Sequence, residues 1–416
     1  MSLAHTPASS PRRILLADAD AFFVAVARLV DPDGAGRAKL LIVGGAPGSR
    51  GVVCSASYEA RLHGVRSAMP ISRALRLCPK AMCVPVPRGA CSTKSREIAS
   101  VLRRFAPIVE CASIDEWYLD LTGTEGVYPG RTLEDVALAI HNAVQDETGL
   151  SVSFGGGSSR LVAKLAVELA KSKPDRPTNG VFIVPAGHEA TFMERFELGD
   201  LPGVGPKFRA RLDQVGLRTV RDVTSSDAAT LTRLVGEREA EWLLRRASGV
   251  DESAVSERDV PKRMSHENTF DHDLRTDEEL DRELLRLVTR LASDLREHDL
   301  SARTVTIRLR DADFKTRQAS RTLPEPVIAD RVIYATAREL LARLRKQRRV
   351  SARLLGVALS SLDVPDRASQ LSLFEAPSAS LETARDRALA GAVDQLRAKF
   401  GAAAIVPGRL TRKSTS

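Results

Sequence analysis

The chain has 416 residues, of which 43% are hydrophobic and 28% charged, a composition typical of globular proteins and not of fibrous or disordered ones. At roughly 150 residues per domain, this length predicts about three domains. Its 62 Lys and Arg residues exceed its 53 Asp and Glu residues, so the net charge of +9 favours an anionic partner such as nucleic acid. No apolar run is long enough to cross a bilayer and the N-terminal residues lack the apolar core of a secretory signal, so we expect a cytoplasmic protein with no membrane partner.

The first 184 residues alternate between strand-like and helix-like patterns. The expected strands are 12–17, 108–112, 117–121, 151–154 and 180–184. The expected helices begin at Ala21 and Thr132 and cover 161–171. Gly155 to Gly157 are expected to form a turn. This alternation predicts a mixed α/β layer with helices on one face.

Three carboxylates lie at the edges of these strands. Asp18 follows the first strand, and Asp115 and Glu116 occupy the turn between the strands 108–112 and 117–121. Carboxylate oxygens without His or Cys suit Mg²⁺, and a pair of such ions can activate the attacking oxygen and stabilise the leaving oxygen in phosphoryl transfer. An Asp-Glu pair in a turn is common, so the residues around it must decide its role.

A helical region with a different composition begins near residue 198. Gly203 and Gly205 lie in Leu201-Pro202-Gly203-Val204-Gly205-Pro206-Lys207, between two helical segments. Glycines allow a tight turn whose amides, at a helix N-terminus, can hold a DNA phosphate. The pattern predicts a helix-hairpin-helix that binds DNA without reading its sequence, with Lys207 beside it.

A βαββαβ unit is expected beyond a polar linker. Its first helix starts with a capping box at Thr276, and its second helix is expected near 328–344. Between Arg303 and Arg353 there are fourteen Lys and Arg and five Asp and Glu, a surplus equal to the whole net charge. Apolar residues alternate with Thr and Arg over 304–310, which predicts a strand with one cationic face for a phosphate backbone. The residues assigned to this DNA-binding face are Arg308, Arg310, Lys315, Arg317 and Arg321.

Several motifs, in this order, closely resemble the Y-family DNA polymerases, in the DinB or DNA polymerase IV branch. They are Asp18-Ala19-Asp20-Ala21-Phe22-Phe23, Ser57-Tyr58-Glu59-Ala60-Arg61 with Gly64 to Pro70, Ser113-Ile114-Asp115-Glu116, and Ala163-Lys164 with Lys171. The resemblance covers roughly 12–375 and implies a right-hand polymerase: a ferredoxin-like palm (12–20 and 84–184), small fingers (21–83), a helix-hairpin-helix thumb (185–250), a linker (251–261), a βαββαβ little finger (262–365) and a tail (366–416).

The resemblance also implies roles for single residues. Asp18, Asp115 and Glu116, with the backbone carbonyl of Ala19, would hold two Mg²⁺ ions. Phe23 would be the steric gate beneath the sugar. Tyr58, Arg61 and Lys171 would bind the triphosphate of the incoming dNTP. Lys173 is a rival for the last role, and Lys171 is preferred because its separation from Lys164 fits the family spacing.

The tail adds a short peptide and a helix. Gln370-Leu371-Ser372-Leu373-Phe374 resembles the motif by which bacterial polymerases dock on the ring-shaped sliding clamp, and it lies in a polar, Pro-flanked stretch. Its alternative is a segment packed on the little finger. Leu389, Val393, Leu396 and Phe400 predict a final amphipathic helix that ends at Gly401, with no assigned role.

The expected function is template-directed, low-fidelity DNA synthesis from dNTPs on primer-template DNA, tolerant of template damage, without proofreading and by a monomer. A non-catalytic DNA-binding and clamp-binding adaptor is the alternative, and the presence of all three carboxylates argues against it. A palm-fold nucleotide cyclase is disfavoured by the helix-hairpin-helix and the basic C-terminal unit.

Overall fold

The structure, a computed structural model, describes residues 11–173, 176–257, 260–364, 380–401 and 403–411. The chain forms two compact units that divide between Glu257 and Arg258, inside the segment expected to be a linker. All five cysteines are free thiols. Among the described residues, none of the helices combines the length and apolarity needed to cross a membrane.

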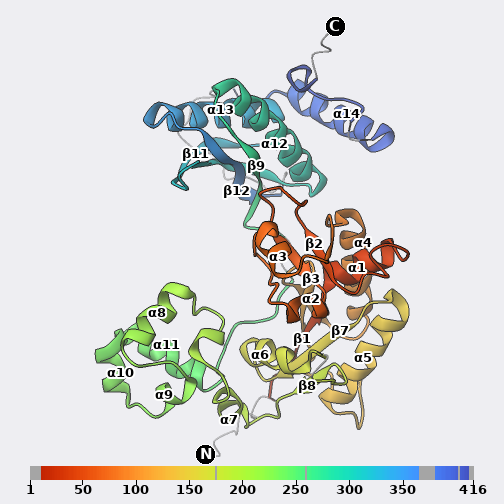
Figure 1. Cartoon of the computed structure of the whole chain (residues 1–416), viewed down its shortest axis with the longest axis vertical. Helices are drawn as coiled ribbons and strands as arrows, with labels where there is room; N and C mark the ends of the chain where they lie inside the picture. Colours follow the sequence, from red (N-terminus) through yellow and green to blue (C-terminus); the bar gives the residue numbers. More distant parts are fainter. Residues whose placement is uncertain (1–10, 174–175, 258–259, 365–379, 402, 412–416) are drawn as a thin grey trace, which may run out of the picture. The chain divides into compact units, whose positions relative to one another are not determined.

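The first unit is built on a five-stranded sheet in the order β5-β6-β1-β7-β8. Figure 1 labels three of these strands, β1, β7 and β8. Strand β1 pairs antiparallel with both β6 and β7, and β7 pairs parallel with β8. The central position of β1 buries all six of its residues, which explains the apolar run from Ile14 to Ala17. The strands are β1 (Ile14–Ala19), β5 (Ile108–Cys111), β6 (Glu116–Asp120), β7 (Val152–Gly157) and β8 (Val181–Ile183).

Helices cover both faces of this sheet, so the expectation of helices on one face is wrong. Alternate residues of β1 point to opposite sides. Leu15 and Ala17 pack in one cluster with residues of α4 (Arg88–Leu102) and α5 (Leu133–Thr148). Ile14 and Leu16 pack on the other side against α6 (Arg160–Ala170). Side chains at the N-caps begin two of these helices: Thr132 closes a capping box on α5, and Ser159 accepts a hydrogen bond from Val162 N in α6.

Gly155 to Gly157 continue β7 and do not form the expected turn. The reason is the close approach of α6. A Cβ atom on Gly155 would lie 2.1 Å from Val167 N and 2.3 Å from Ala163 O, both in the backbone of that helix. Glycine is required here because helix and sheet touch backbone to backbone.

A smaller layer and a helical region complete this unit. The small layer is the sheet β3-β2-β4 with two helices, and α1 lies between it and the larger sheet, with Phe22 and Val26 facing the large core and Val24 and Ala27 facing β2. Its elements are α1 (Phe22–Val30), β2 (Leu41–Gly44), β3 (Val53–Ala56), α2 (Tyr58–Leu62), α3 (Ile71–Leu77) and β4 (Met82–Val84). The helical region contains α7 (Glu189–Met193), η1 (Leu198–Asp200), α8 (Pro206–Gln214), α9 (Val220–Thr224), α10 (Ala228–Val235) and α11 (Glu237–Ala247).

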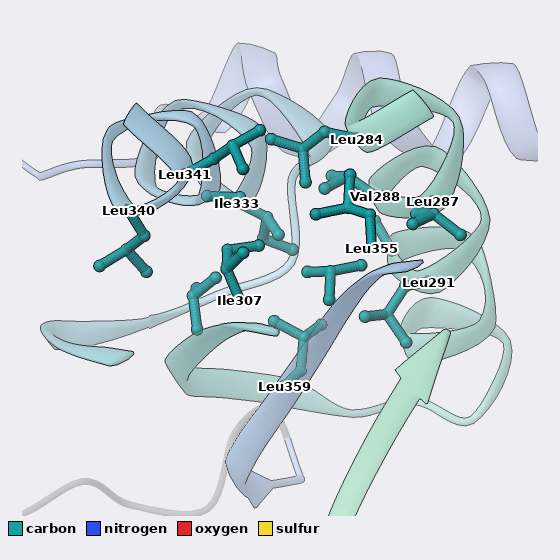
Figure 2. Close-up of a cluster of buried hydrophobic side chains, with 14 of the residues drawn as sticks. Leu284, Leu287, Val288, Leu291, Ile307, Ile333, Leu340, Leu341, Leu355 and Leu359 are labelled. Carbon is teal, nitrogen blue, oxygen red and sulfur yellow. The ribbon is translucent and has the colours of Figure 1, made fainter. Parts of the chain in front are cut away.

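The second unit has the expected βαββαβ order. Its sheet runs β11-β10-β12-β9, all antiparallel, and two helices pack on one face. Figure 2 shows leucines of α12 and α13 meeting Ile307, Leu355 and Leu359 of the sheet. The elements are β9 (Arg263–Leu274), α12 (Asp277–Glu297), β10 (Ser301–Asp311), β11 (Thr316–Val327), α13 (Asp330–Gln347), β12 (Ala352–Asp363), α14 (Ala384–Phe400) and η2 (Gly408–Leu410).

The close contact at Gly155 gives a prediction about stability. Gly155→Ala should lower the free energy of unfolding by about 1–3 kcal/mol, because the added methyl group forces α6 away from β7. Urea unfolding followed by circular dichroism measures the change. Gly126→Ala is the matched control, since a Cβ atom there meets nothing within 4 Å. Equal midpoints for the two variants would contradict the packing argument.

Candidate active site

A cavity of about 190 Å³ lies in the first unit, where the large sheet meets helix α2. It brings together residues from β1, β3, α1, α2, β6 and the loop before β6. The expected carboxylates and the expected nucleotide-binding residues all line this one cavity. Its lining is Asp18, Ala19, Ala21, Phe22, Phe23, Cys54, Ser55, Tyr58, Arg61, Ser67, Asp115, Glu116 and Lys171.

The sheet register places the carboxylates side by side. Asp18 is the direct partner of Glu116 in the antiparallel β1–β6 pair, and Ala19 N donates to the carbonyl oxygen of Asp115 (2.9 Å). Ser113 Oγ donates to Asp115 Oδ1 at 2.5 Å and holds that side chain in the loop. The pairing of β1 with β6 therefore brings Asp18 beside Asp115, which lies 97 residues further along the chain, and beside Glu116.

Two lysines, Lys164 of α6 and Lys171 at its C-cap, balance these carboxylates. Lys171 Nζ lies 2.9 Å from Asp18 Oδ2, and Lys164 Nζ lies 2.5 Å from Glu116 Oε1. Burial raises the pKa of Asp18 to about 7, although the Lys171 ammonium opposes that shift. Burial alone would lower the pKa of Lys171, but the carboxylates of Asp18 and Glu168 outweigh it, and the pKa is raised. The site thus holds a buried negative charge that a cation must offset.

The donor set suits a hard divalent cation, because Asp18, Asp115 and Glu116 offer only oxygen atoms to the cavity. Within the described ranges, however, no three His, Cys, Asp or Glu side chains are grouped closely enough to hold an ion. Asp20 does not line the cavity: its carboxylate accepts hydrogen bonds from Ser151 Oγ (2.7 Å) and Ser153 Oγ (2.9 Å). The residue types fit a metal ion. In this structure the ammonium groups of Lys164 and Lys171 offset the negative charge of Glu116 and Asp18.

Helix α2 presents Tyr58 and Arg61 to the cavity. Ser57, buried at its N-cap, accepts hydrogen bonds from Ala60 N and Leu41 N and donates to Lys39 O, which ties the start of α2 to β2. Arg61 Nε donates to Ala56 O (2.9 Å), and its guanidinium lies 5.0 Å from the centre of the Tyr58 ring. Burial, and secondly the nearby Asp20 carboxylate, raise the pKa of the Tyr58 hydroxyl. One wall of the cavity therefore carries a fixed cation and a neutral hydroxyl.

The two candidates for the triphosphate-binding lysine differ in position. Lys171 lines the cavity, whereas Lys173 is exposed, does not line the cavity and forms a backbone bridge with Arg176. This placement favours Lys171. Lys164, absent from the candidate list, is the residue that sequence reasoning missed, and its seven-residue separation from Lys171 was the available signal.

The helix-hairpin-helix candidates occupy one turn of the helical region. Gly203 has a φ of +102°, and a Cβ atom there would meet the Trp242 ring at 2.9 Å. Gly205 is the N-cap of α8 with Pro206 at the first helical position, and Lys207 is exposed in the first turn. The exposed start of α8 is therefore open to a ligand.

The basic residues of the second unit divide between two faces. Thr304, Thr306, Arg308 and Arg310 alternate with buried neighbours along β10 and lie on the face opposite the helices. Lys315 is exposed in the turn before β11. This part of the expected cationic face is present.

Arg317 and Arg321 do not extend that face, which corrects the expectation. They are the register partners of Leu309 and Val305, so their side chains lie on the helix-covered side of the sheet. Arg317 donates to Leu344 O and to Asp311 Oδ1 (2.9 Å), and Arg321 pairs with Glu339 of α13 (2.5 Å). Both arginines join the sheet to its helix layer. Residues 370–374, the expected clamp-binding peptide, lie outside the described residues.

Comparison with known proteins agrees with this arrangement. The model of the impB/mucB/samB family matches residues 17–168, and the model of its C-terminal domain matches residues 261–373. A model of the thumb domain of DNA polymerase-iota matches residues 199–251. These three matches cover, in chain order, most of the large sheet, most of the helical region and the βαββαβ unit.

Curated relatives and solved structures point to the same family. DNA polymerase IV of Desulfatibacillum aliphaticivorans is 36% identical over 397 residues, which are 95% of this chain and 96% of the relative. DNA polymerase IV of Halorhodospira halophila is 38% identical, covering 86% of this chain and 98% of the relative. A Y-family polymerase chimera, Dbh-Dpo4(243-245)-Dbh, superposes with a TM-score of 0.73 at 24% identity over 85% of this chain and 99% of its own. DinB from Sulfolobus solfataricus gives 0.55 at 25% identity over 84% and 98%. The chain therefore belongs to the Y-family DNA polymerases, in the DinB or DNA polymerase IV branch.

Proposed function

We propose that this protein is a translesion DNA polymerase that adds deoxynucleotides from dNTPs to the 3′ end of a DNA primer, directed by a template, at low fidelity and without proofreading. One observation carries the proposal: Asp18, Asp115 and Glu116 line the same cavity as Tyr58 and the other nucleotide-binding candidates. A non-catalytic adaptor would not need carboxylates and phosphate-binding cations in one cavity. A cytoplasmic monomer acting on chromosomal DNA is consistent with this activity.

Membership of this family implies dependence on a divalent metal, and we assign Mg²⁺, as two ions, to this site. Asp18, Asp115 and Glu116, with the carbonyl of Ala19, would hold them, and bound ions would neutralise charge on the reacting phosphate oxygens. Binding would replace the ammonium groups as the partners of the carboxylates. Lys171 would then be free to bind the triphosphate.

The chain's own cations position the nucleotide. Arg61 is fixed to the end of β3 and can offer its remaining N–H groups to phosphate oxygens. Tyr58, kept neutral by its raised pKa, can donate its hydroxyl hydrogen to the same group. Both Phe22 and Phe23 line the cavity, but Phe22 is buried in the core whereas Phe23 is partly exposed, so we assign the contact with the sugar to Phe23.

Removing the carboxylates should stop synthesis. Asp18→Ala, or Asp115→Ala with Glu116→Ala, should lower primer extension by at least about a thousandfold while DNA affinity stays within a few-fold, because these groups act on the reacting phosphate and not on the duplex. Asp120→Ala, at the other end of β6, is the control. Extension within a few-fold of wild type would contradict the assignment of these carboxylates to the metal ions.

Shortening the proposed gate should change sugar selection. Phe23→Ala should admit ribonucleotides, because the ring would no longer contact a 2′-hydroxyl. The ratio of dNTP to NTP incorporation in single-nucleotide extension measures this effect. Phe105→Leu is the control, because Phe105 packs on the same core but does not line the cavity. A ratio unchanged in Phe23→Ala would rule out the gate.

The two faces of the second unit give a matched test of DNA binding. Arg308→Ala with Arg310→Ala should flatten the slope of log affinity against log salt by about one unit per lost phosphate contact. Arg321→Ala removes an equally charged residue from the helix-covered side and should leave the slope unchanged. Equal slopes for all variants would show that Arg308 and Arg310 do not contact DNA phosphates.

We also propose that residues 370–374 dock on the bacterial sliding clamp. Docking would raise the effective concentration of the polymerase at the primer end. Replacing Gln370, Leu371, Leu373 and Phe374 by Ala, with Ser372 kept, should leave extension without clamp unchanged and remove its stimulation by clamp. Equal stimulation of wild type and variant would show that the peptide has a structural role instead.

A further inference from the structure

The C-terminal helix α14 is attached to the second unit through its polar side chains. Asp394 accepts hydrogen bonds from Arg296, with Oδ2 2.6 Å from Nε and Oδ1 3.0 Å from Nη2. Asp386 accepts two from Arg331, at 2.7 and 2.8 Å. Ala390 is the buried residue of the helix. In an ordinary amphipathic helix the polar face meets water. In α14 the polar face with Asp386 and Asp394 contacts the domain instead.

The apolar side of α14 is exposed. Leu389, Val393, Leu396 and Phe400 repeat at intervals of four, three and four residues, which places them on one stripe along the helix. Leu389 is 63% exposed, Leu396 41% and Phe400 64%. Val393, which lies between Leu389 and Leu396, is only partly exposed. Scattered exposed leucines are common, but three exposed apolar side chains on one side of a helix are typical of an interaction surface.

The free charge beside this stripe is positive. Arg385 is one turn before Leu389, and Lys399 is one turn after Leu396. Both are exposed, and in the part of the chain that the structure describes neither has a carboxylate partner. The acidic residues of the helix are engaged by arginines of the domain. A partner that covered the stripe would thus meet cations and no free carboxylate of α14.

We propose that this stripe, residues 389, 393, 396 and 400, is a docking surface for an acidic amphipathic helix of a partner protein. Apolar residues of such a helix would pack on the stripe, and its carboxylates would face Arg385 and Lys399. A second copy of the chain fits less well, because antiparallel pairing of two α14 helices sets Arg385 of one against Lys399 of the other. A membrane surface also fits less well, because an interfacial helix carries many Lys and Arg residues beside its apolar face, whereas Arg385 and Lys399 are the two exposed cations assigned to this stripe.

The test uses the full chain and two labelled synthetic peptides. Both peptides carry leucines at the same helical spacing, one with glutamates and the other with lysines at the flanking positions. Fluorescence anisotropy should show saturable binding of the glutamate peptide and at least about tenfold weaker binding of the lysine peptide. Leu389→Ser with Leu396→Ser and Phe400→Ser should abolish binding, while thermal unfolding and primer extension stay unchanged.

A charge swap separates specific docking from nonspecific hydrophobic binding. Arg385→Glu with Lys399→Glu should reverse the preference, so that the lysine peptide binds more tightly. Equal binding of both peptides, or of neither, to the wild-type chain would overturn the proposal. A dimer in analytical ultracentrifugation that the serine variant loses would assign the stripe to a second copy. Binding to phosphatidylserine vesicles that the serine variant loses, without peptide binding, would assign it to a membrane.

Discussion

The burial of one negative charge at the end of β1 is the constraint on which the catalytic unit depends. Asp18 belongs to a strand enclosed by β6 and β7, and a carboxylate in such a place is costly unless a cation is near. Lys171, the C-cap of α6, provides that cation, and Lys164 of the same helix pairs with Glu116, the strand partner of Asp18. The helix must therefore lie close along the sheet, and the glycines of β7 permit it.

The sequence predicted those parts of the site that depend on local pattern. Apolar runs located the strands, and carboxylates at their ends indicated a shared edge. The prediction of function depended more on the order of several motifs along the chain than on any single pair of carboxylates. The role of Gly155 to Gly157 could not be read in this way, because a glycine run is compatible with a turn or with a strand under a close helix. Only the way in which α6, the next element along the chain, packs back on β7 decides between them.

The second unit, which carries the excess of Lys and Arg residues, shows a second limit of sequence reasoning. Alternation along β10 correctly separated Arg308 and Arg310 from the core residues between them. Which residues of β11 share their face depends on the length of the connecting turn, since a change of one residue exchanges the two faces. The observed register sets Arg317 opposite Leu309 and Arg321 opposite Val305. The count of Lys and Arg residues therefore overestimated the positive charge that faces DNA, because Arg317 and Arg321 contact residues of α13.

The backbone contact between β7 and α6 also controls the electrostatics of the site. Lys164 and Lys171 are carried by α6, and the depth at which that helix rests on Gly155 sets how far both ammonium groups reach toward Glu116 and Asp18. A side chain that raised the helix would withdraw both positive charges together and push the pKa of Asp18 higher still. A substitution in the apolar core, touching no ionisable group, would thereby weaken the ability of this site to bind a cation at neutral pH.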